Sequence, residues 1–293
     1  MICVFGATGN TGGAVAAHLL KKGKKVRVVG RQRERLAALV QAGAESRVGD
    51  IENVDFVREA LSGAEAAYVM IPPNMATDDF RAYQARVVDS LTRGLESAGV
   101  RHVALLSSLG AHHSEGTGPI VAVHQFEQRL KKIAGLNALF VRAGFFMENV
   151  LMGIGSIKAQ GVYGGPMPAE TAVPIIAAAD IGAYAGGRLE RLDFTGTSVV
   201  HLIGPKAITQ NELVATLGQA IGKPVRYAQV PFEDLEQGLK QAGLKPSVVA
   251  VFMEMYRGAG RGLVAPEEGG TVVQTPTPFE TFASRVFAPA YAR

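Results

Sequence analysis

Cysteine is almost absent from this chain: Cys3 is the single cysteine among 293 residues. A disulfide scaffold and a cysteine-ligated zinc cluster are therefore both excluded. A chain without disulfides is typical of a reducing compartment, so we expect a cytoplasmic protein.

Charge of one sign and long apolar runs are equally scarce. The 30 Lys and Arg residues outnumber the 26 Asp and Glu residues only slightly, giving a net charge of +4, which argues against a partner nucleic acid or membrane surface. Every apolar run is interrupted before it reaches the roughly 18 residues of a membrane span. No basic leader precedes the apolar residues that start at Ile2, so we expect no signal peptide. The hydrophobic content of 47% also excludes a disordered chain.

Glycine, by contrast, is abundant, and short apolar segments alternate with amphipathic ones. The 35 glycines amount to about 12% of the chain, against about 7% in an average protein. Alternating strands and helices with almost continuously apolar strands predict an α/β fold, a doubly wound parallel sheet of the Rossmann type. The predicted strands are 2–5, 26–29, 46–49, 66–71, 103–106 and 138–141, and the helices between them are 11–22, 32–42, 54–61, 79–98 and 121–133.

After Arg142 the rhythm changes, which predicts a smaller C-terminal α+β lobe. We expect a dinucleotide-binding domain at 1–144 and a region, 145–293, that is mainly a substrate lobe, with about 178–205 returning to the main sheet. Thr209 and Glu212 form a capping-box pattern that opens a helix. The remaining predicted elements are a helix at 180–189, a strand at 198–203, an irregular stretch at 166–174, and helices at 209–221, 233–242 and 247–256.

A glycine-rich loop between the first predicted strand and helix is the strongest local signal. Glycine permits a tight turn, lets main-chain N–H groups approach a pyrophosphate, and allows the helix to pack closely on the strand. The helix N-terminus adds partial positive charge. This pattern predicts dinucleotide binding, and the alternative is a turn that serves only packing. The loop consists of Gly6, Ala7, Thr8, Gly9, Asn10, Thr11 and Gly12.

The end of the second predicted strand indicates which dinucleotide is bound. NAD sites usually place an acidic residue here to bond the ribose hydroxyls, whereas arginine accommodates a 2′-phosphate. Gly30-Arg31 stands at this place, with Arg33 and Arg35 nearby. The sequence therefore favours NADP(H) over NAD(H), although Arg33 and Arg35 also suit an ordinary solvated helix start.

Three later strand ends supply further candidates at the same edge of the sheet. Asp50 follows the third strand and could accept the adenine amino group, or complement a helix dipole instead. Ile71, Pro72 and Pro73 end the fourth strand, and Ser107-Ser108 ends the fifth, where serines also serve as helix caps.

Four segments together resemble the NmrA-like group of atypical short-chain dehydrogenases, and within it the bacterial NAD(P)H:quinone oxidoreductases. They are 6–12, Gly49-Asp50, Arg-Ala-Gly-Phe-Phe-Met-Glu-Asn at 142–149, and Ala-Asp-Ile-Gly at 179–182. The likeness runs over about the first 240 residues. It implies that Arg31 contacts the 2′-phosphate, that Ile71, Pro72 and Pro73 contact the cofactor ribose, and that Phe145, Phe146, Met147 and Glu148 contact the nicotinamide end.

The chain departs from ordinary short-chain dehydrogenases in lacking a Tyr-x-x-x-Lys pair, the usual proton donor. Tyr184 followed by Arg188 is the nearest approach. Instead, the expected helix carries His124, a candidate proton carrier because imidazole titrates near neutrality; a structural or cofactor-contacting role is the alternative. Glu127 is expected to be a charge on the helix surface. His112-His113 lacks a third suitably spaced ligand, so no metal site is expected.

These features predict an NADPH-dependent oxidoreductase that transfers hydride to a quinone or a similar electron-poor small molecule. Hydride transfer to an electron-poor ring depends mainly on positioning, so it needs the Tyr/Lys pair less than alcohol chemistry does. Phe145, Phe146, Met147 and Met152 could wall a flat substrate or be plain core. Two alternatives stay open: a non-catalytic NADP(H)-sensing regulator with a protein partner, and a ketone or enone reductase with another proton donor. The sequence permits a homodimer.

Overall fold

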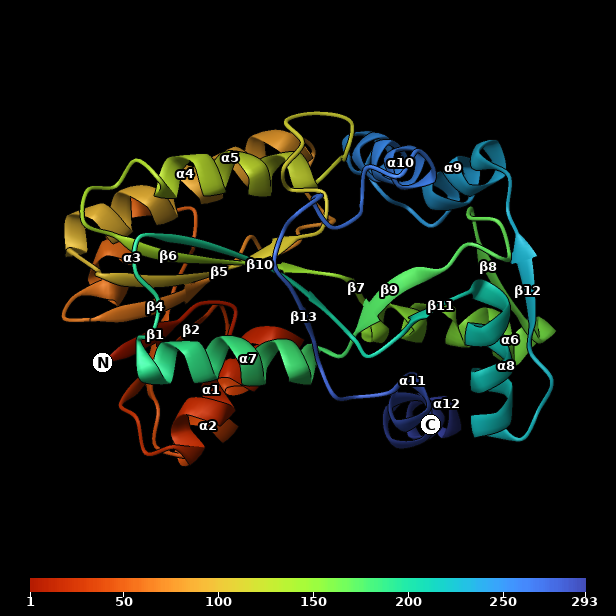
Figure 1. Ribbon diagram of the computed structural model, residues 1–293, viewed down its shortest axis with the longest axis horizontal. Helices are drawn as coiled ribbons and strands as arrows, with labels where there is room; N and C mark the ends of the chain where they lie inside the picture. The colour runs from red at the N-terminus through yellow and green to blue at the C-terminus, as the bar shows by residue number, and fades with distance from the viewer.

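The computed structural model describes residues 1–293 and is built on one eight-stranded sheet (Figure 1). Every strand pair in this sheet is parallel. The order across the sheet is β13-β10-β6-β5-β4-β1-β2-β3, so the predicted doubly wound parallel sheet is confirmed. The strands are β1 Ile2–Val4, β2 Val26–Gly30, β3 Glu45–Val48, β4 Ala66–Val69, β5 His102–Ser108, β6 Asn137–Ala143, β10 Thr197–Ile203 and β13 Val272–Gln274.

Helices cover both faces of the sheet, as Figure 1 shows. On one face α1 (Asn10–Lys21) and α7 (Ala178–Arg191) pack against each other and against the strands, with the short α2 (Ala37–Gln41) beside them. On the other face lie α3 (Val54–Leu61), α4 (Phe80–Ala98) and α5 (Ile120–Leu130). Each face holds a core of 23 buried hydrophobic residues, which is why the strands are apolar along their whole length.

Local signals set the ends of these helices. The Asn53 side chain accepts hydrogen bonds from two N–H groups of the first turn of α3, and Asp79 does the same for one N–H of α4. Gly99 ends α4 with a φ of 64°, which costs glycine little. The predicted helix at 32–42 is shorter than expected, because a 3₁₀ turn, Glu34–Leu36, precedes α2.

The smaller lobe is formed by segments between β6 and the C-terminus and has a core of 13 buried residues. It contains two small sheets, of order β11-β9-β7 and β12-β8. The Thr209–Glu212 capping box is present at the start of α8, as predicted. The lobe's strands are β7 Phe145–Phe146, β8 Val162–Gly165, β9 Val173–Ile176, β11 Ala207–Ile208 and β12 Arg226–Gln229; its helices are a 3₁₀ helix Met147–Gly153, α6 Ile154–Gln160, α8 Gln210–Ile221, α9 Phe232–Gln241, α11 Phe279–Phe282 and α12 Ala288–Ala292, with a π turn Ala283–Phe287 between the last two.

Helix α10 (Pro246–Gly260) contacts α9 of the smaller lobe and also α4. Its Val248 and Val251 pack on Phe80 at the start of α4, and Ser247 accepts a hydrogen bond from the Phe80 N–H. The helix therefore lies against α4, on the face of the sheet that α4 and α5 cover (Figure 1). None of the helices combines the length and apolarity needed to cross a bilayer.

Candidate functional site

The glycine-rich loop joins β1 to α1 at the carboxyl edge of the sheet. Gly6 has a φ of 66°, and a Cβ atom on Gly12 would lie 2.3 Å from the Gly6 carbonyl oxygen. Both glycines are therefore required by the loop itself. Gly9 differs, because its backbone is extended and an added Cβ would meet only the Gly6 oxygen, at 3.4 Å. Packing does not demand glycine at position 9, so the reason for it lies outside the loop.

The first turn of α1 leaves its N–H groups available to a ligand. Gly9 is the N-cap and provides no side-chain hydrogen bond, and the first turn contains no acidic residue. Thr11 is 5% exposed, and its hydroxyl lies close to Tyr68, a buried residue of β4. Thr8, Gly9 and Asn10 remain accessible. A helix start with this composition binds a phosphate through main-chain donors and the helix dipole.

Two arginines flank this loop. Arg31 follows β2 directly and is exposed. Arg35 reaches back, and its Nη2 donates to the Thr8 carbonyl at 3.3 Å. The structure thus places Arg35 on the loop rather than in a purely solvated helix start, while the Arg31 guanidinium forms no hydrogen bond within the chain. Arg31 is the cation that can turn to a phosphate at the end of β2.

The segments that follow β3 and β4 approach a tyrosine that the sequence did not single out. Tyr83 of α4 is 3% exposed and donates from its hydroxyl to the Pro72 carbonyl at 2.9 Å. Burial raises the pKa of Tyr83 to about 12, and Arg31 and Asp50 are close enough to modulate it. The structure therefore brings Arg31, Asp50 and Pro72 to one region. Asp50 is exposed and accepts a hydrogen bond from the Glu52 N–H, and Ile71 and Pro73 flank Pro72.

Residues 145–148 of the 142–149 motif differ in burial: some are open to a ligand and others are part of the fold. Phe145 is 38% exposed at the start of β7, whereas Met147 is 1% exposed within the core of the smaller lobe. Both carboxylate oxygens of Glu148 accept from the Ala178 N–H, at 3.0 and 3.1 Å, and so cap α7; burial raises the pKa of Glu148. Phe145 and the partly exposed Phe146 are the side chains in this group that are open to a ligand.

His124 of α5 is held by the loop that follows β5. Its Nδ1 lies 2.9 Å from the Ala111 carbonyl oxygen. A carbonyl can only accept, so Nδ1 carries the hydrogen and donates it, which leaves Nε2 as the nitrogen that can exchange a proton. The two histidine rings of the same loop, His112 and His113, lie with their centroids 3.9 Å apart and their planes tilted by 44°, and His112 is only partly exposed.

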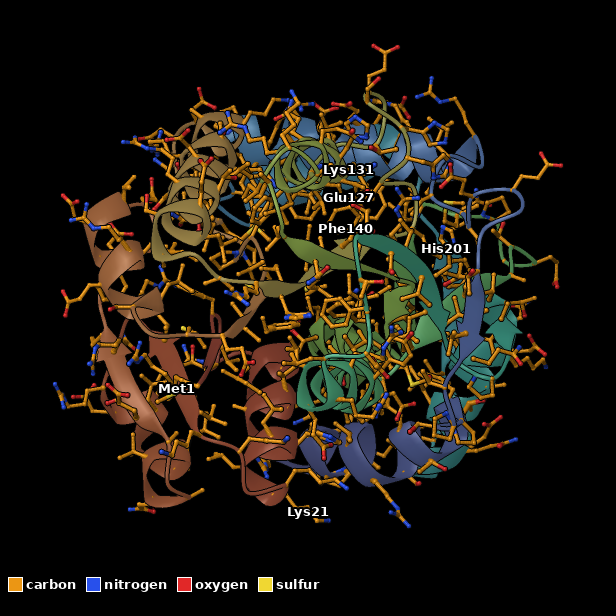
Figure 2. The ribbon with its side chains drawn as sticks, turned by 60° about the vertical axis from the view of Figure 1, so that its left-hand side comes forward. Met1, Lys21, Glu127, Lys131, Phe140 and His201 are labelled. Carbon is orange, nitrogen blue, oxygen red and sulfur yellow. The ribbon has the colours of Figure 1, made fainter.

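Glu127 is not on the helix surface, and that expectation is wrong. Its side chain is fully buried and accepts three hydrogen bonds: from Ser107 Oγ at 2.6 Å, and from Nε and Nη2 of Arg142 at 3.0 and 2.7 Å. Arg142 also donates from Nη1 to Glu267 at 2.6 Å. The Arg142 and Ser107 side chains thus meet a carboxylate inside the molecule, below the carboxyl edge. Figure 2 labels this carboxylate, Glu127, close to Phe140 of β6.

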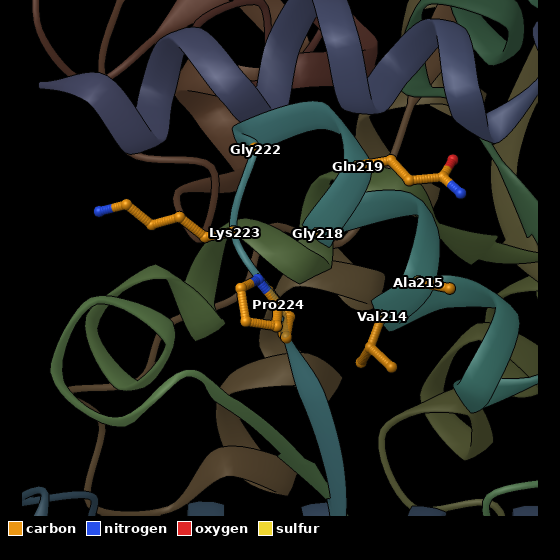
Figure 3. Close-up of a pocket in the computed structure, with 8 residues that line it drawn as sticks. Val214, Ala215, Gly218, Gln219, Gly222, Lys223 and Pro224 are labelled. Atoms are coloured by element: carbon orange, nitrogen blue, oxygen red, sulfur yellow. The ribbon is translucent and has the colours of Figure 1, made fainter.

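A surface hollow of about 410 Å³ lies elsewhere, where α8 ends and β12 begins (Figure 3). Lys223 is its only ionisable side chain, and none of the candidate residues lines it. It offers neither the donors for a diphosphate nor a wall for a ring. The residues lining it are Val214, Ala215, Gly218, Gln219, Gly222, Lys223, Pro224 and Val225.

Comparison with known families agrees with this arrangement. The model of the NmrA-like family matches residues 1–262. The chain belongs to the NmrA-like family. The match includes the glycine loop, Arg31, the 142–149 motif and the whole parallel sheet except β13, so the resemblance stated from sequence is confirmed.

A curated protein and two solved structures resemble this NmrA-like protein over almost its whole length. The NAD(P)H azoreductase of Xenophilus azovorans is 27% identical over 292 residues, which cover 100% of this chain and 98% of the azoreductase. The NADPH-dependent quinone oxidoreductase of Escherichia coli, solved with NADPH, superposes with a TM-score of 0.77 at 24% identity and covers 98% of this chain and 100% of its own. The triphenylmethane reductase of Citrobacter sp., complexed with NADP(H), has a TM-score of 0.78 at 22% identity and the same coverage.

Proposed function

We propose that this NmrA-like protein is an NADPH-dependent oxidoreductase that transfers hydride to a quinone or a similar electron-poor small molecule. The observation that carries the proposal is the loop before α1: an uncapped helix start, formed by glycines, with an exposed arginine at the end of the neighbouring strand. The named relatives, an azoreductase and a quinone oxidoreductase among them, reduce electron-poor compounds with the same kind of cofactor.

The residues present fit such a cofactor. The Gly9 N–H donates to the Gly6 carbonyl within the loop, so main-chain donors in the first turn of α1, beginning with Asn10, would hold the pyrophosphate. Arg31 would pair with the 2′-phosphate. The region of Asp50 and Pro72 would receive the adenosine, and Phe145 and Phe146 would flank the nicotinamide end, as would the backbone of Met147 and Glu148. When bound, the cofactor supplies a hydride. The remaining residues of 6–12 and 71–73 are proposed to shape the same path.

The smaller lobe is proposed to contribute the substrate side of the site. Met152 is 82% exposed in the 3₁₀ helix that follows β7. Together with Phe145 it presents apolar surface of the kind that packs on flat rings. The reduction of a quinone also needs a proton, and Nε2 of His124 is the proposed carrier.

One experiment separates this function from its alternatives. The protein is titrated with NADPH and with NADH by calorimetry, and then mixed with NADPH and a panel of quinones, azo compounds, ketones and enones while the nicotinamide absorbance is followed. We expect tight NADPH binding and turnover with the quinones or azo compounds. Turnover with ketones or enones alone would favour the third function, and binding without oxidation would favour the sensing regulator. No heat with either nucleotide would refute the proposal.

The proton carrier and the assembly are tested separately. His124→Ala is expected to lower kcat without changing NADPH affinity, and unchanged turnover would remove His124 from the mechanism. A homodimer is proposed as the assembly and is measured by sedimentation equilibrium.

A further inference from the structure

Three polar side chains stand in register on neighbouring strands below the proposed site. Ser107 of β5 lies opposite Arg142 of β6, and Arg142 lies opposite His201 of β10. Residues paired in this way point to the same face of a sheet. All three are buried, with exposed fractions of 5%, 3% and 0%, so a polar row crosses the interior close to the carboxyl ends of three strands.

Two carboxylates bind this polar row, one of them fully buried and the other half-exposed. Glu127 is fully buried and binds Ser107 and Arg142 from α5. Glu267 approaches from the other side, and its side chain is 48% exposed. Its carboxylate accepts from Arg142, and its own N–H donates to Nε2 of His201 at 3.2 Å. Residue 267 is thus fixed twice, through its side chain and through its backbone.

The segment that contains Glu267 packs on the loop after β5. A Cβ atom on Gly110 would lie 2.6 Å from the Leu263 carbonyl oxygen, so the two backbones are in direct contact. The Gly116 N–H donates to the Glu254 carboxylate of α10 at 3.1 Å. The 110–118 loop therefore takes its place from α10 and from residues 261–267. It also contains Ala111, the hydrogen-bond partner of His124.

We propose that Glu267 is a positioning residue that fastens residues 261–271 to Arg142 and thereby holds the 110–118 loop, with His124, over the substrate side of the site. This rests on the proposed function, since that function assigns the carboxyl edge to cofactor and substrate. The Glu127 and Glu267 carboxylates share the Arg142 guanidinium. If the half-exposed Glu267 is removed, Arg142 is still paired with Glu127, so no buried charge is left without a partner.

The test compares Glu267→Ala with Glu268→Ala, its exposed neighbour, which forms no hydrogen bond. In Glu267→Ala we expect amide hydrogen exchange in 110–118 and 261–271 to rise by about tenfold, corresponding to about 1.4 kcal/mol, and the KM for quinone to rise by a similar factor. Exchange in the glycine loop and the affinity for NADPH should not change. Glu267→Gln keeps an acceptor and should show a smaller effect. Glu268→Ala should behave as the unaltered protein.

The outcomes separate the two proposals. Unchanged exchange in 110–118 for Glu267→Ala would overturn the positioning role, as would an equal effect of Glu268→Ala. Faster exchange there with an unaltered KM would also overturn it, because the loop would then not serve the substrate. If the unaltered protein bound no NADPH, the proposed function would fail, and with it the role assigned to Glu267, whereas the exchange data would still report whether the contact holds the loop.

Discussion

Arg31 lies at the position where a dinucleotide site distinguishes NADP(H), which carries a 2′-phosphate on its ribose, from NAD(H), which does not. Its guanidinium is exposed and has no partner within the chain, so nothing else in the fold depends on it. Arg31→Ala should weaken NADPH binding by about 10- to 100-fold, the range of a charge-assisted hydrogen bond of about 1.5–3 kcal/mol, and should barely change NADH binding. Calorimetric titration with both nucleotides measures this. Arg33→Ala is the matched control, and equal losses for both nucleotides would show that Arg31 does not recognise the 2′-phosphate.

Gly9 and Gly12 separate the loop's ligand requirement from its folding requirement. A methyl group on Gly9 has room within the protein, whereas one on Gly12 would collide with the Gly6 carbonyl oxygen at 2.3 Å. The free energy of unfolding of Gly9→Ala should therefore lie within about 0.5 kcal/mol of that of the unaltered protein. Its affinity for NADPH should nevertheless fall at least about tenfold. Gly12→Ala should lose both stability and binding. Thermal unfolding and calorimetry measure the two quantities, and normal NADPH binding by Gly9→Ala would contradict the assignment.

For single residues, the sequence predicted where the loop and Arg31 lie better than it predicted which side chains contact one another. The loop and Arg31 were located because their neighbours in sequence define them: a strand, a turn and a helix start. Glu127 was misassigned because its burial depends on Arg142, which lies 15 residues away on a strand, and on Ser107 of another strand. Helical periodicity places Glu127 on a face but does not say what covers that face.

Between elements, the Glu127–Arg142 pair fastens α5 to the centre of the sheet. Removing one member leaves the other charged and buried, which costs about 3–5 kcal/mol. Glu127→Gln should therefore lower the free energy of unfolding, measured in urea, by an amount near the lower end of this range, since Glu267 still contacts Arg142.

Two further variants test this reading. Glu59→Gln removes the same charge from an exposed position of α3 and should change stability by less than about 0.5 kcal/mol. Glu127→Leu combined with Arg142→Met should recover much of the loss, because neither charge is then stranded. If the double variant were less stable than Glu127→Gln, the ion pair would contribute more to the stability than two apolar side chains in its place.

The elements themselves were predictable to the extent that they are long and periodic. The helix at 54–61 and the capped start of α8 agree with expectation. Strands β7 and β11 have two residues each, too few for any period to be visible, and their pairing joins distant segments. The C-terminal helices were also not predicted, since a π turn and Pro289 break up their pattern.

For the molecule as a whole, titrating groups around Arg142 make stability depend on pH. Arg142 holds the pKa of Glu267 below its ordinary 4.5, and burial lowers the pKa of His201 and His112 below 6.5. Each lowered pKa means that the unfolded chain takes up the proton first, so stability present at higher pH is lost as the pH falls. The raised pKa of Glu148 acts in the opposite sense.

The free energy of unfolding should therefore fall in two stages on acidification, below about pH 6.5 through the histidines and below about pH 4.5 through Glu267. Urea titrations at a series of pH values from about 7.5 to about 3 measure this, and Glu267→Gln should weaken the second stage. A free energy that stayed level or rose between pH 7 and 5 would contradict the expectation.

The parallel sheet has a consequence for how this polypeptide is made. Its last two strands, β10 and β13, pair at His201 and Val272, and the smaller core needs Phe279, Phe282 and Phe287. On the ribosome, β6 thus emerges long before β10, its outer neighbour in the sheet. The edge of β6 stays unpaired until more than fifty further residues have been translated. Long-range parallel pairing of this kind is slow and prone to aggregation. The nascent chain should accordingly depend on chaperones until its final segment has been released.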